Sequence, residues 1–198
     1  GWPVERLDRT SAGDWLLATP KGRLTARQVV LATDAPAARA LLTTSPTTAE
    51  AAASLRWPEG QASAIARCWF DVTPEITADG GMFGGDFVLD NFFWLHRFQP
   101  AFQQWHAETG GSAVECHIYG PPELLAEADE TILTRAAADL TRAWPALRGR
   151  LVHAHLQRNR GVHTLFSIGT TDHHLGVQTP WPNLYACGDW IRHLAPAP

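Results

Sequence analysis

The sequence predicts a chain of mixed α/β and α+β class, in which an antiparallel-sheet region is inserted between two parts of a parallel-sheet domain. Two short, continuously apolar runs, residues 29–32 and 184–187, have the pattern of strands buried on both faces of a parallel sheet. Between them, several apolar segments separated by glycine-rich and polar turns indicate an antiparallel sheet. We therefore expect residues 1–44 and 158–198 to form one domain and residues 45–157 the inserted one.

The N-terminal residues are expected to form a small β-meander. Residues 3–7, 14–18 and 27–33 have strand character, and residues 20–23 carry the turn chemistry that precedes the third strand. Asp34 then stands where it can cap a short helix over residues 37–42, with Pro36 in the first turn. The threonine-, serine- and proline-rich residues 43–48 are expected to be a loop.

In the inserted region, strand patterns cover residues 62–72, 87–89, 92–98, 113–119 and 151–156. Pro121 and Pro122 begin a helix in which apolar residues recur at helical spacing as far as Trp144, and Pro145 ends it. The glycines between residues 80 and 85 lack the spacing of a phosphate-binding loop and are interpreted as a turn. Residues 158–180 are interpreted as a polar loop, including Arg158 and Arg160.

Composition excludes several classes of protein. With 45% hydrophobic and 18% charged residues, the chain is expected to be folded and globular. A net charge of -4 without a basic block argues against a nucleic-acid partner, and no apolar run is long enough to span a bilayer. Three widely spaced cysteines favour a reducing compartment, so a cytoplasmic location is expected. Cys187 lies in an apolar run and is interpreted as a buried, unreactive thiol.

The most informative segment is the Gly188-Asp189 pair directly after the last apolar run. Gly188 has no Cβ, so a ligand can lie against its backbone. Asp189 offers an acceptor at the carboxyl end of a strand, where open α/β sheets bind nucleotides. The alternative interpretation is a strand-ending turn in which the Asp189 carboxylate caps a helix or bonds to its own backbone.

Other chemistries receive less support from the sequence. His153 and His155 share one strand face, and Asp172, His173 and His174 are three further potential ligands. No metal-binding spacing accompanies them, so no metal site is expected. No G-x-S-x-G nucleophile motif occurs, and the acidic residues 127, 129 and 130 are expected on the outer face of a helix. No catalytic residue is therefore identified.

The order of these elements, together with Cys187-Gly188-Asp189-Trp190, resembles the FAD-dependent oxidoreductases of the amine oxidase and phytoene desaturase superfamily. Residues 90–97, 117–122 and 187–190 are most similar to carotenoid desaturases, including isorenieratene-synthase-like enzymes. The resemblance implies a partial, Rossmann-like FAD-binding domain that carries an inserted substrate domain. Because no G-x-G-x-x-G motif occurs and the chain ends before the superfamily's flavin-facing helix, we expect the C-terminal portion of a longer enzyme, inactive and unable to retain FAD alone.

The resemblance also implies which residues contact ligands. Those expected to contact FAD are Gly188, Asp189, Trp190, Val4, Ala32 and Thr33, with Trp190 near the ring system and Val4 near the adenine. Nine tryptophans are many for this length, and an aromatic-walled cavity for a greasy substrate is one explanation. Phe92, Trp94 and Trp69 are the candidates to line it, and ordinary core packing is the alternative.

The implied reaction is desaturation of a hydrophobic, carotenoid-like substrate by hydride transfer to the flavin, which is expected to need no dedicated acid or base. An enzyme that takes its substrate from a bilayer would attach peripherally to a membrane, so this is a second expectation for location. Two alternatives stay open. One is an amine or protoporphyrinogen oxidase of the same superfamily, and the other is a non-catalytic α+β module that binds a hydrophobic ligand.

Overall fold

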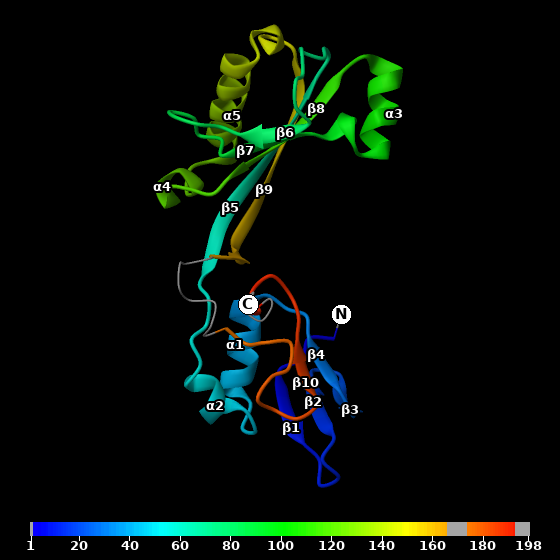
Figure 1. Cartoon of the computed structure of the whole chain (residues 1–198), viewed down its shortest axis with the longest axis vertical. Helices are drawn as coiled ribbons and strands as arrows, with labels where there is room; N and C mark the ends of the chain where they lie inside the picture. Colours follow the sequence, from blue (N-terminus) through cyan, green and yellow to red (C-terminus); the bar gives the residue numbers. More distant parts are fainter. Residues whose placement is uncertain (1, 166–173, 193–198) are drawn as a thin grey trace, which may run out of the picture. The chain divides into compact units, whose positions relative to one another are not determined.

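The computed structural model describes residues 2–165 and 174–192. The chain divides into two compact units, unit 1 with Gly1–Gln61 and Gly161–Pro198, and unit 2 with Ala62–Arg160 (Figure 1). The predicted mixed fold, with an antiparallel sheet inserted into a parallel one, is confirmed. The first boundary falls after residue 61 and not after residue 44, because helix α2 (Ala49–Ala53) buries Ala52 in the core of unit 1.

The β-meander of unit 1 has three strands, β1 (Arg6–Arg9), β2 (Trp15–Thr19) and β3 (Gly22–Ala26), which pair antiparallel in that order. The prediction was wrong in treating residues 20–23 as the turn before a third strand at 27–33. Gly22 adopts a φ of 133°, so the turn closes within two residues and the chain continues as β3. The Thr19 hydroxyl donates to the Gly22 carbonyl at 2.8 Å across this turn.

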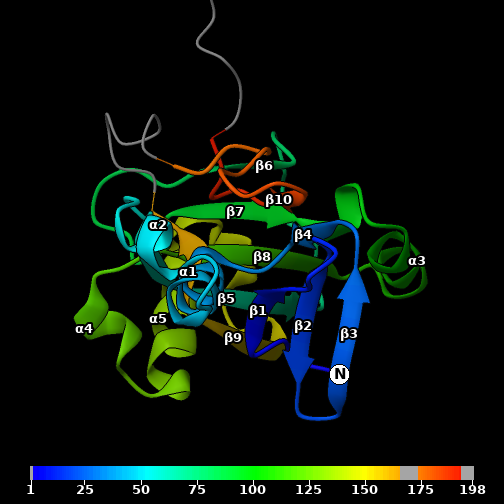
Figure 2. The same cartoon turned by 90° about the horizontal axis from the view of Figure 1, so that it is seen from below.

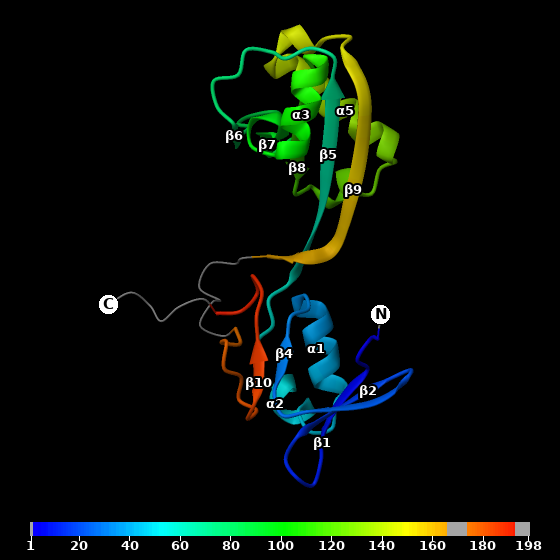
Figure 3. The same ribbon diagram turned by 90° about the vertical axis from the view of Figure 1, so that its right-hand side faces the viewer.

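The strand at residues 27–33 instead leaves the meander. Strand β4 (Val29–Leu31) pairs in parallel with β10 (Leu184–Ala186), Leu184 opposite Val29 and Ala186 opposite Leu31 (Figure 3). The two apolar runs were predicted only to belong to one domain, and the structure pairs them side by side although they lie more than 150 residues apart in the sequence. Such short strands are stabilised by the apolar residues that cover them, which include Trp190 and residues of the next helix.

Helix α1 (Ala35–Thr44) follows β4 and packs Ala38 and Leu42 into the core of unit 1. The predicted cap is confirmed, because the backbone N–H of Ala37 donates to the Asp34 carboxylate at 2.8 Å. The helix is longer than predicted, since residues 43 and 44 belong to its last turn and not to a loop.

Unit 2 is built on a five-stranded sheet in the order β6-β7-β8-β5-β9 (Figure 2). Its strands are β5 (Gly60–Phe70), β6 (Gly80–Met82), β7 (Asn91–Trp94), β8 (Ser112–Ile118) and β9 (Leu151–Thr164). Three predictions were wrong in detail: residues 87–89 form no strand, the first glycines of the 80–85 cluster form β6, and residues 95–97 form a 3-10 helix. Strand β9 also continues through residues interpreted as a polar loop.

The helices of unit 2 are α3 (Pro100–Thr109), α4 (Pro122–Leu125) and α5 (Asp129–Ala143), with a 3-10 turn at Pro145–Leu147. Helix α3 was not predicted, and the single helix expected over residues 122–144 is broken after Leu125. At the break, the Arg158 guanidinium donates to the backbone carbonyls of Leu125, the last residue of α4, and of Glu127, in the connection to α5, so both carbonyls have partners outside a helix.

The two faces of this sheet differ. One face packs against α5 and holds the core, with Cys68, Cys116 and Ile132 fully buried. The opposite face, which we call the open face, carries the alternate residues of β5, β8 and β7, among them Arg67, Glu115, His117 and Phe93. Helix α3 covers one end of it, where Phe102 stacks on Trp69 with the ring centres 6.2 Å apart. None of the helices in the described part of the chain has the length and apolar composition that crossing a bilayer requires.

Candidate functional site

The candidate site lies at the carboxyl edge of the β4–β10 pair, a term we use for Ala32, Thr33, Gly188 and Asp189. The backbone N–H of Cys187 donates to the Leu31 carbonyl at 2.9 Å, which extends the parallel pairing to the ends of both strands. One turn further, the Trp190 indole N–H donates to the Thr33 carbonyl at 2.7 Å. The four residues of the carboxyl edge are therefore held close together, and all four are exposed. Exposed backbone at this end of parallel strands is where nucleotides bind in open α/β sheets.

The geometry at Gly188 explains why the position is glycine. Its φ of 133° lies in a region that residues with a Cβ rarely adopt. A Cβ there would lie 2.9 Å from Nε1 and 3.0 Å from Cδ1 of Trp190. The Trp190 ring cannot easily yield, because it is 1% exposed, bonded to Thr33 and tilted against Trp57 at 5.9 Å.

Asp189 presents its carboxylate to solvent at the carboxyl edge. Within residues 2–165 and 174–192, no hydrogen bond or ion pair to this carboxylate is found. Cys187 is exposed, which corrects the interpretation of a buried thiol. Its side chain leaves the core at the point where the strand ends.

The remaining predicted cofactor residues occupy different settings. Trp190 is buried beneath Gly188, so any contact between its indole and a ligand would require a shift of this ring. Val4 is half-buried ahead of β1 and packs against the core of unit 1. Cofactor contacts of all six predicted residues, Gly188 and Asp189 included, stay predictions.

The structure does not bring the three predicted substrate residues together. Phe92 and Trp94 lie on the α5-covered face, where both meet the Trp144 ring edge-on at about 5 Å and Trp94 is fully buried. Trp69 lies on the open face, between Phe102 and His153. The separation follows from the alternation of side chains along neighbouring strands, and one cavity wall built by all three residues is excluded in this arrangement.

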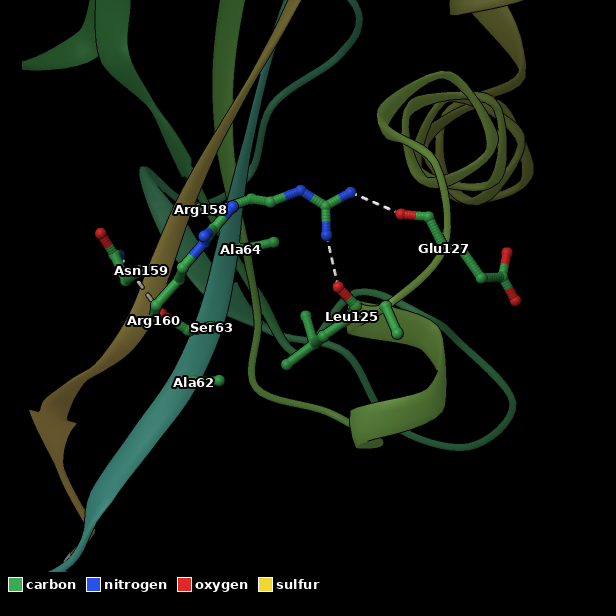
Figure 4. Close-up of a pocket in the computed structure, with 9 residues that line it drawn as sticks. Ala62, Ser63, Ala64, Leu125, Glu127, Arg158, Asn159 and Arg160 are labelled. Atoms are coloured by element: carbon green, nitrogen blue, oxygen red, sulfur yellow. Dashed lines mark hydrogen bonds between the residues drawn. The ribbon is translucent and has the colours of Figure 1, made fainter.

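Unit 2 has a cavity of about 360 Å³ between β5, β9 and the α4–α5 connection (Figure 4). Its lining is Ala62, Ser63, Ala64, Leu125, Ala126, Glu127, Arg158, Asn159 and Arg160. Figure 4 shows the Arg158 guanidinium bonded to two backbone carbonyls, so this side chain shapes the wall. A second cavity, of about 340 Å³, contains His96, His106 and Thr73. None of the predicted substrate residues lines either one.

Histidines do not assemble a metal centre in the part of the chain that the structure describes, where no group of three or more candidate ligands is found. His153 and His155 are exposed on β9, and His173 lies outside the described residues. Sequence reasoning missed a different cluster, Arg67, Glu115, His117 and Tyr119. Its signal was the alternation Glu-x-His-x-Tyr along one predicted strand.

Solved structures define the class of this fold. The chain is similar to a putative protoporphyrinogen oxidase from Exiguobacterium sp. 255-15, with a TM-score of 0.62 and 18% identity over 94% of this chain and 41% of that one. It is also similar to putrescine oxidase, with a TM-score of 0.62 and 12% identity over 93% of this chain and 42% of that one. The chain thus has the fold of part of these oxidases. No protein-family model matches the sequence.

Curated proteins give a more particular relationship. The chain is 24% identical to the carotenoid phi-ring synthase of Chlorobaculum tepidum over 98% of its length, and 30% identical to that of Streptomyces griseus over 85%. It spans about a third of the length of each relative, 32% and 33%. The predicted resemblance to the carotenoid-desaturase branch of the amine oxidase superfamily is confirmed by these similarities of sequence and fold.

Proposed function

We propose that this chain forms part of a flavin-dependent oxidoreductase, with FAD bound at the carboxyl edge of the β4–β10 pair in unit 1. The observation that carries the proposal is the parallel pairing itself, which brings Thr33 and Gly188-Asp189 to one exposed edge from opposite ends of the chain. Similarity to carotenoid phi-ring synthases and to oxidases of the same fold supports it.

The residues at the carboxyl edge fit a dinucleotide. Gly188 leaves the backbone open, since no side chain rises from it beside the exposed Ala32 and Thr33. The Asp189 carboxylate is available to accept hydrogen bonds from ligand hydroxyl groups. When bound, FAD supplies a hydride acceptor, while the protein supplies placement and exclusion of water.

We propose a carotenoid or similar isoprenoid as the substrate. The proposal draws on the names of the two curated relatives. A polyene has almost no hydrogen-bonding groups, so its binding depends on apolar area, at about 25 cal/mol per Å². Uptake of such a substrate from a bilayer would favour peripheral attachment of the complete enzyme to a membrane. Within the same superfamily, amine or protoporphyrinogen oxidation is the second candidate, favoured by the names of the structural relatives.

The cofactor assignment is tested by Asp189→Ala in the complete protein. A charge-assisted hydrogen bond contributes about 1.5–3 kcal/mol, so the Kd for FAD should rise by roughly 10- to 150-fold. Glu50→Ala is the matched control, because Glu50 is an exposed acidic residue on α2 of the same unit. Equal FAD affinity in both variants and the parent protein, measured by flavin fluorescence titration, would remove Asp189 from the site.

Substrate class is tested by incubating the complete protein with carotenoids and, in separate reactions, with amines. Desaturated or ring-modified carotenoids are the expected products. Peroxide release from amines with no change in any carotenoid would overturn the isoprenoid proposal and leave the flavin proposal standing. Expressed alone, this chain is expected to copurify without FAD, because it contains no G-x-G-x-x-G phosphate-binding turn. A stoichiometric flavin spectrum would contradict that expectation.

A further inference from the structure

We propose that Arg67, Glu115, His117 and Tyr119 form a proton relay on the open face of unit 2, which ends at the Tyr119 hydroxyl and accepts a proton from a ligand bound there. Side chains alternate along a strand, so Glu115, His117 and Tyr119 follow one another on the same face of β8 and its extension. Arg67 stands opposite Glu115 in the register of β5 and β8.

The four side chains form a continuous chain of contacts. The Arg67 guanidinium donates through Nε to Glu115 Oε2 at 3.0 Å, and its Nη2 bonds to the same oxygen. The other carboxylate oxygen, Glu115 Oε1, lies 3.5 Å from His117 Nε2. On the far side of the imidazole, His117 Nδ1 lies 2.9 Å from the Tyr119 hydroxyl.

These contacts select the imidazole tautomer. A neutral His117 with its proton on Nε2 directs that N–H at the Glu115 carboxylate. With the proton on Nδ1 instead, the lone pair of Nε2 would point at the negatively charged carboxylate oxygen, which is unfavourable. The favoured tautomer leaves a lone pair on Nδ1, which accepts the Tyr119 O–H. Arg67 holds Glu115 from the other side, so the carboxylate is fixed in position. This is the base-and-orienter geometry that activates hydroxyl groups.

The end of the relay lies where a ligand can reach it. Tyr119 and Phe93 are each 38% exposed, and Met82 is 82% exposed on a neighbouring strand. The Phe93 ring also lies 5.5 Å from the imidazole of His117. A polar relay that ends among exposed apolar side chains fits a ligand with an apolar body and an acidic C–H or O–H group.

In the proposed step, the ligand proton moves to the Tyr119 oxygen while the Tyr119 proton moves to His117 Nδ1. The imidazolium that forms is stabilised by Glu115, and the electron pair of the broken bond stays on the ligand. The inference rests on the proposed function for the identity of that ligand.

The test needs neither FAD nor substrate. N-acetylimidazole transfers its acetyl group to an activated phenol and releases imidazole, and the sequence has two tyrosines, Tyr119 and Tyr185. We expect Tyr119 to be acetylated at least about tenfold faster than Tyr185, as followed by peptide mass spectrometry. His117→Gln should remove this advantage, and Glu115→Gln should reduce it. His155→Gln is the matched control, because His155 is an exposed histidine outside the relay, and this variant should leave the rate unchanged.

Hydroxyl-radical footprinting separates activation from exposure, since it reports the accessibility of Tyr119 and not the basicity of its partner. Unchanged footprinting together with slow acetylation in His117→Gln would support the relay. Unchanged footprinting with an unchanged acetylation rate would overturn it. Because no flavin is present in this assay, its result is independent of the FAD titration of Asp189→Ala.

Discussion

Replacing Gly188 by alanine is the sharpest test of how the carboxyl edge is built. The change should lower the free energy of unfolding of the chain in two ways. A residue with a Cβ at a φ of 133° is strained by about 1–3 kcal/mol, and forcing the new methyl group against the Trp190 ring costs about 1–3 kcal/mol more. The second cost arises because Trp190 is fully packed and bonded to the Thr33 carbonyl, so it has nowhere to move.

A matched variant separates the two costs. Gly13 also has a positive φ, 87°, but a Cβ there would meet nothing within 4 Å. Gly13→Ala therefore measures strain in a similar backbone region without a contact. The extra destabilisation of Gly188→Ala should be about 1–3 kcal/mol, which corresponds to a further fall in Tm of roughly 2–12 °C for a chain of this length. Thermal unfolding followed by tryptophan fluorescence measures both variants.

Adding Trp190→Phe to Gly188→Ala tests whether contact with the Trp190 ring causes the extra destabilisation. The atoms that the new Cβ would meet, Nε1 and Cδ1, belong to the five-membered ring that phenylalanine lacks. We expect the extra cost of Gly188→Ala to fall by more than half in that background. If Gly188→Ala destabilises the chain no more than Gly13→Ala, or if its cost is the same with phenylalanine at 190, the contact with Trp190 does not explain this glycine.

Three further predictions concern single side chains. Asp139→Ala should lower the free energy of unfolding of unit 2 by about 2–3 kcal/mol, because the buried carboxylate accepts hydrogen bonds from the N–H groups of residues 88 and 89. Glu130→Ala, on the exposed face of the same helix, should lower it by under about 0.5 kcal/mol. Urea unfolding measures both variants. Burial lowers the pKa of His96, so the unfolded chain binds a proton at a higher pH than the folded chain does. His96 therefore contributes its full stabilisation above about pH 6.5, and the free energy of unfolding should fall by up to about 1.4 kcal/mol per pH unit below that. His96→Gln should remove this slope. Burial raises the pKa of the Cys68 thiol to about 12 and that of Cys116 well above its usual range, so DTNB at pH 8 should label exposed Cys187 alone until the chain is unfolded.

The sequence was sufficient for features that depend on local residues. The Asp34 cap, the apolar character of residues 29–31 and 184–186, and the glycine after the last strand are all consequences of side-chain chemistry at neighbouring positions. The same local patterns predicted β8 within one residue at each end. They also supported the family resemblance, because its motifs lie at strand ends where single residues matter.

Predictions failed where distant contacts outweigh local pattern. Residues 122–144 have one continuous helical periodicity, yet the structure divides them into two helices. At the break, Arg158 from β9 donates hydrogen bonds to two backbone carbonyls. Helix α3 has no fully buried residue, so its apolar side, Phe102 and Trp105, is too narrow to predict a helix from the sequence. Similarly, Trp69 and Trp94 are equivalent aromatic residues in the sequence, but the pleat of the sheet places one on the open face and the other in the core.

By itself, the sequence determined the class of fold, the order of its main elements and the glycine and aspartate at the end of the last strand, since these follow from hydrophobic period and turn chemistry. Only the tertiary structure decided that β4 pairs with β10, that Trp190 lies beneath Gly188, and that Glu115, His117 and Tyr119 meet Arg67. The physical reason is that strand register, and the face of the sheet on which each side chain lies, depend on hydrogen bonds and packing between segments far apart in the chain. No local sequence pattern contains these long-range contacts.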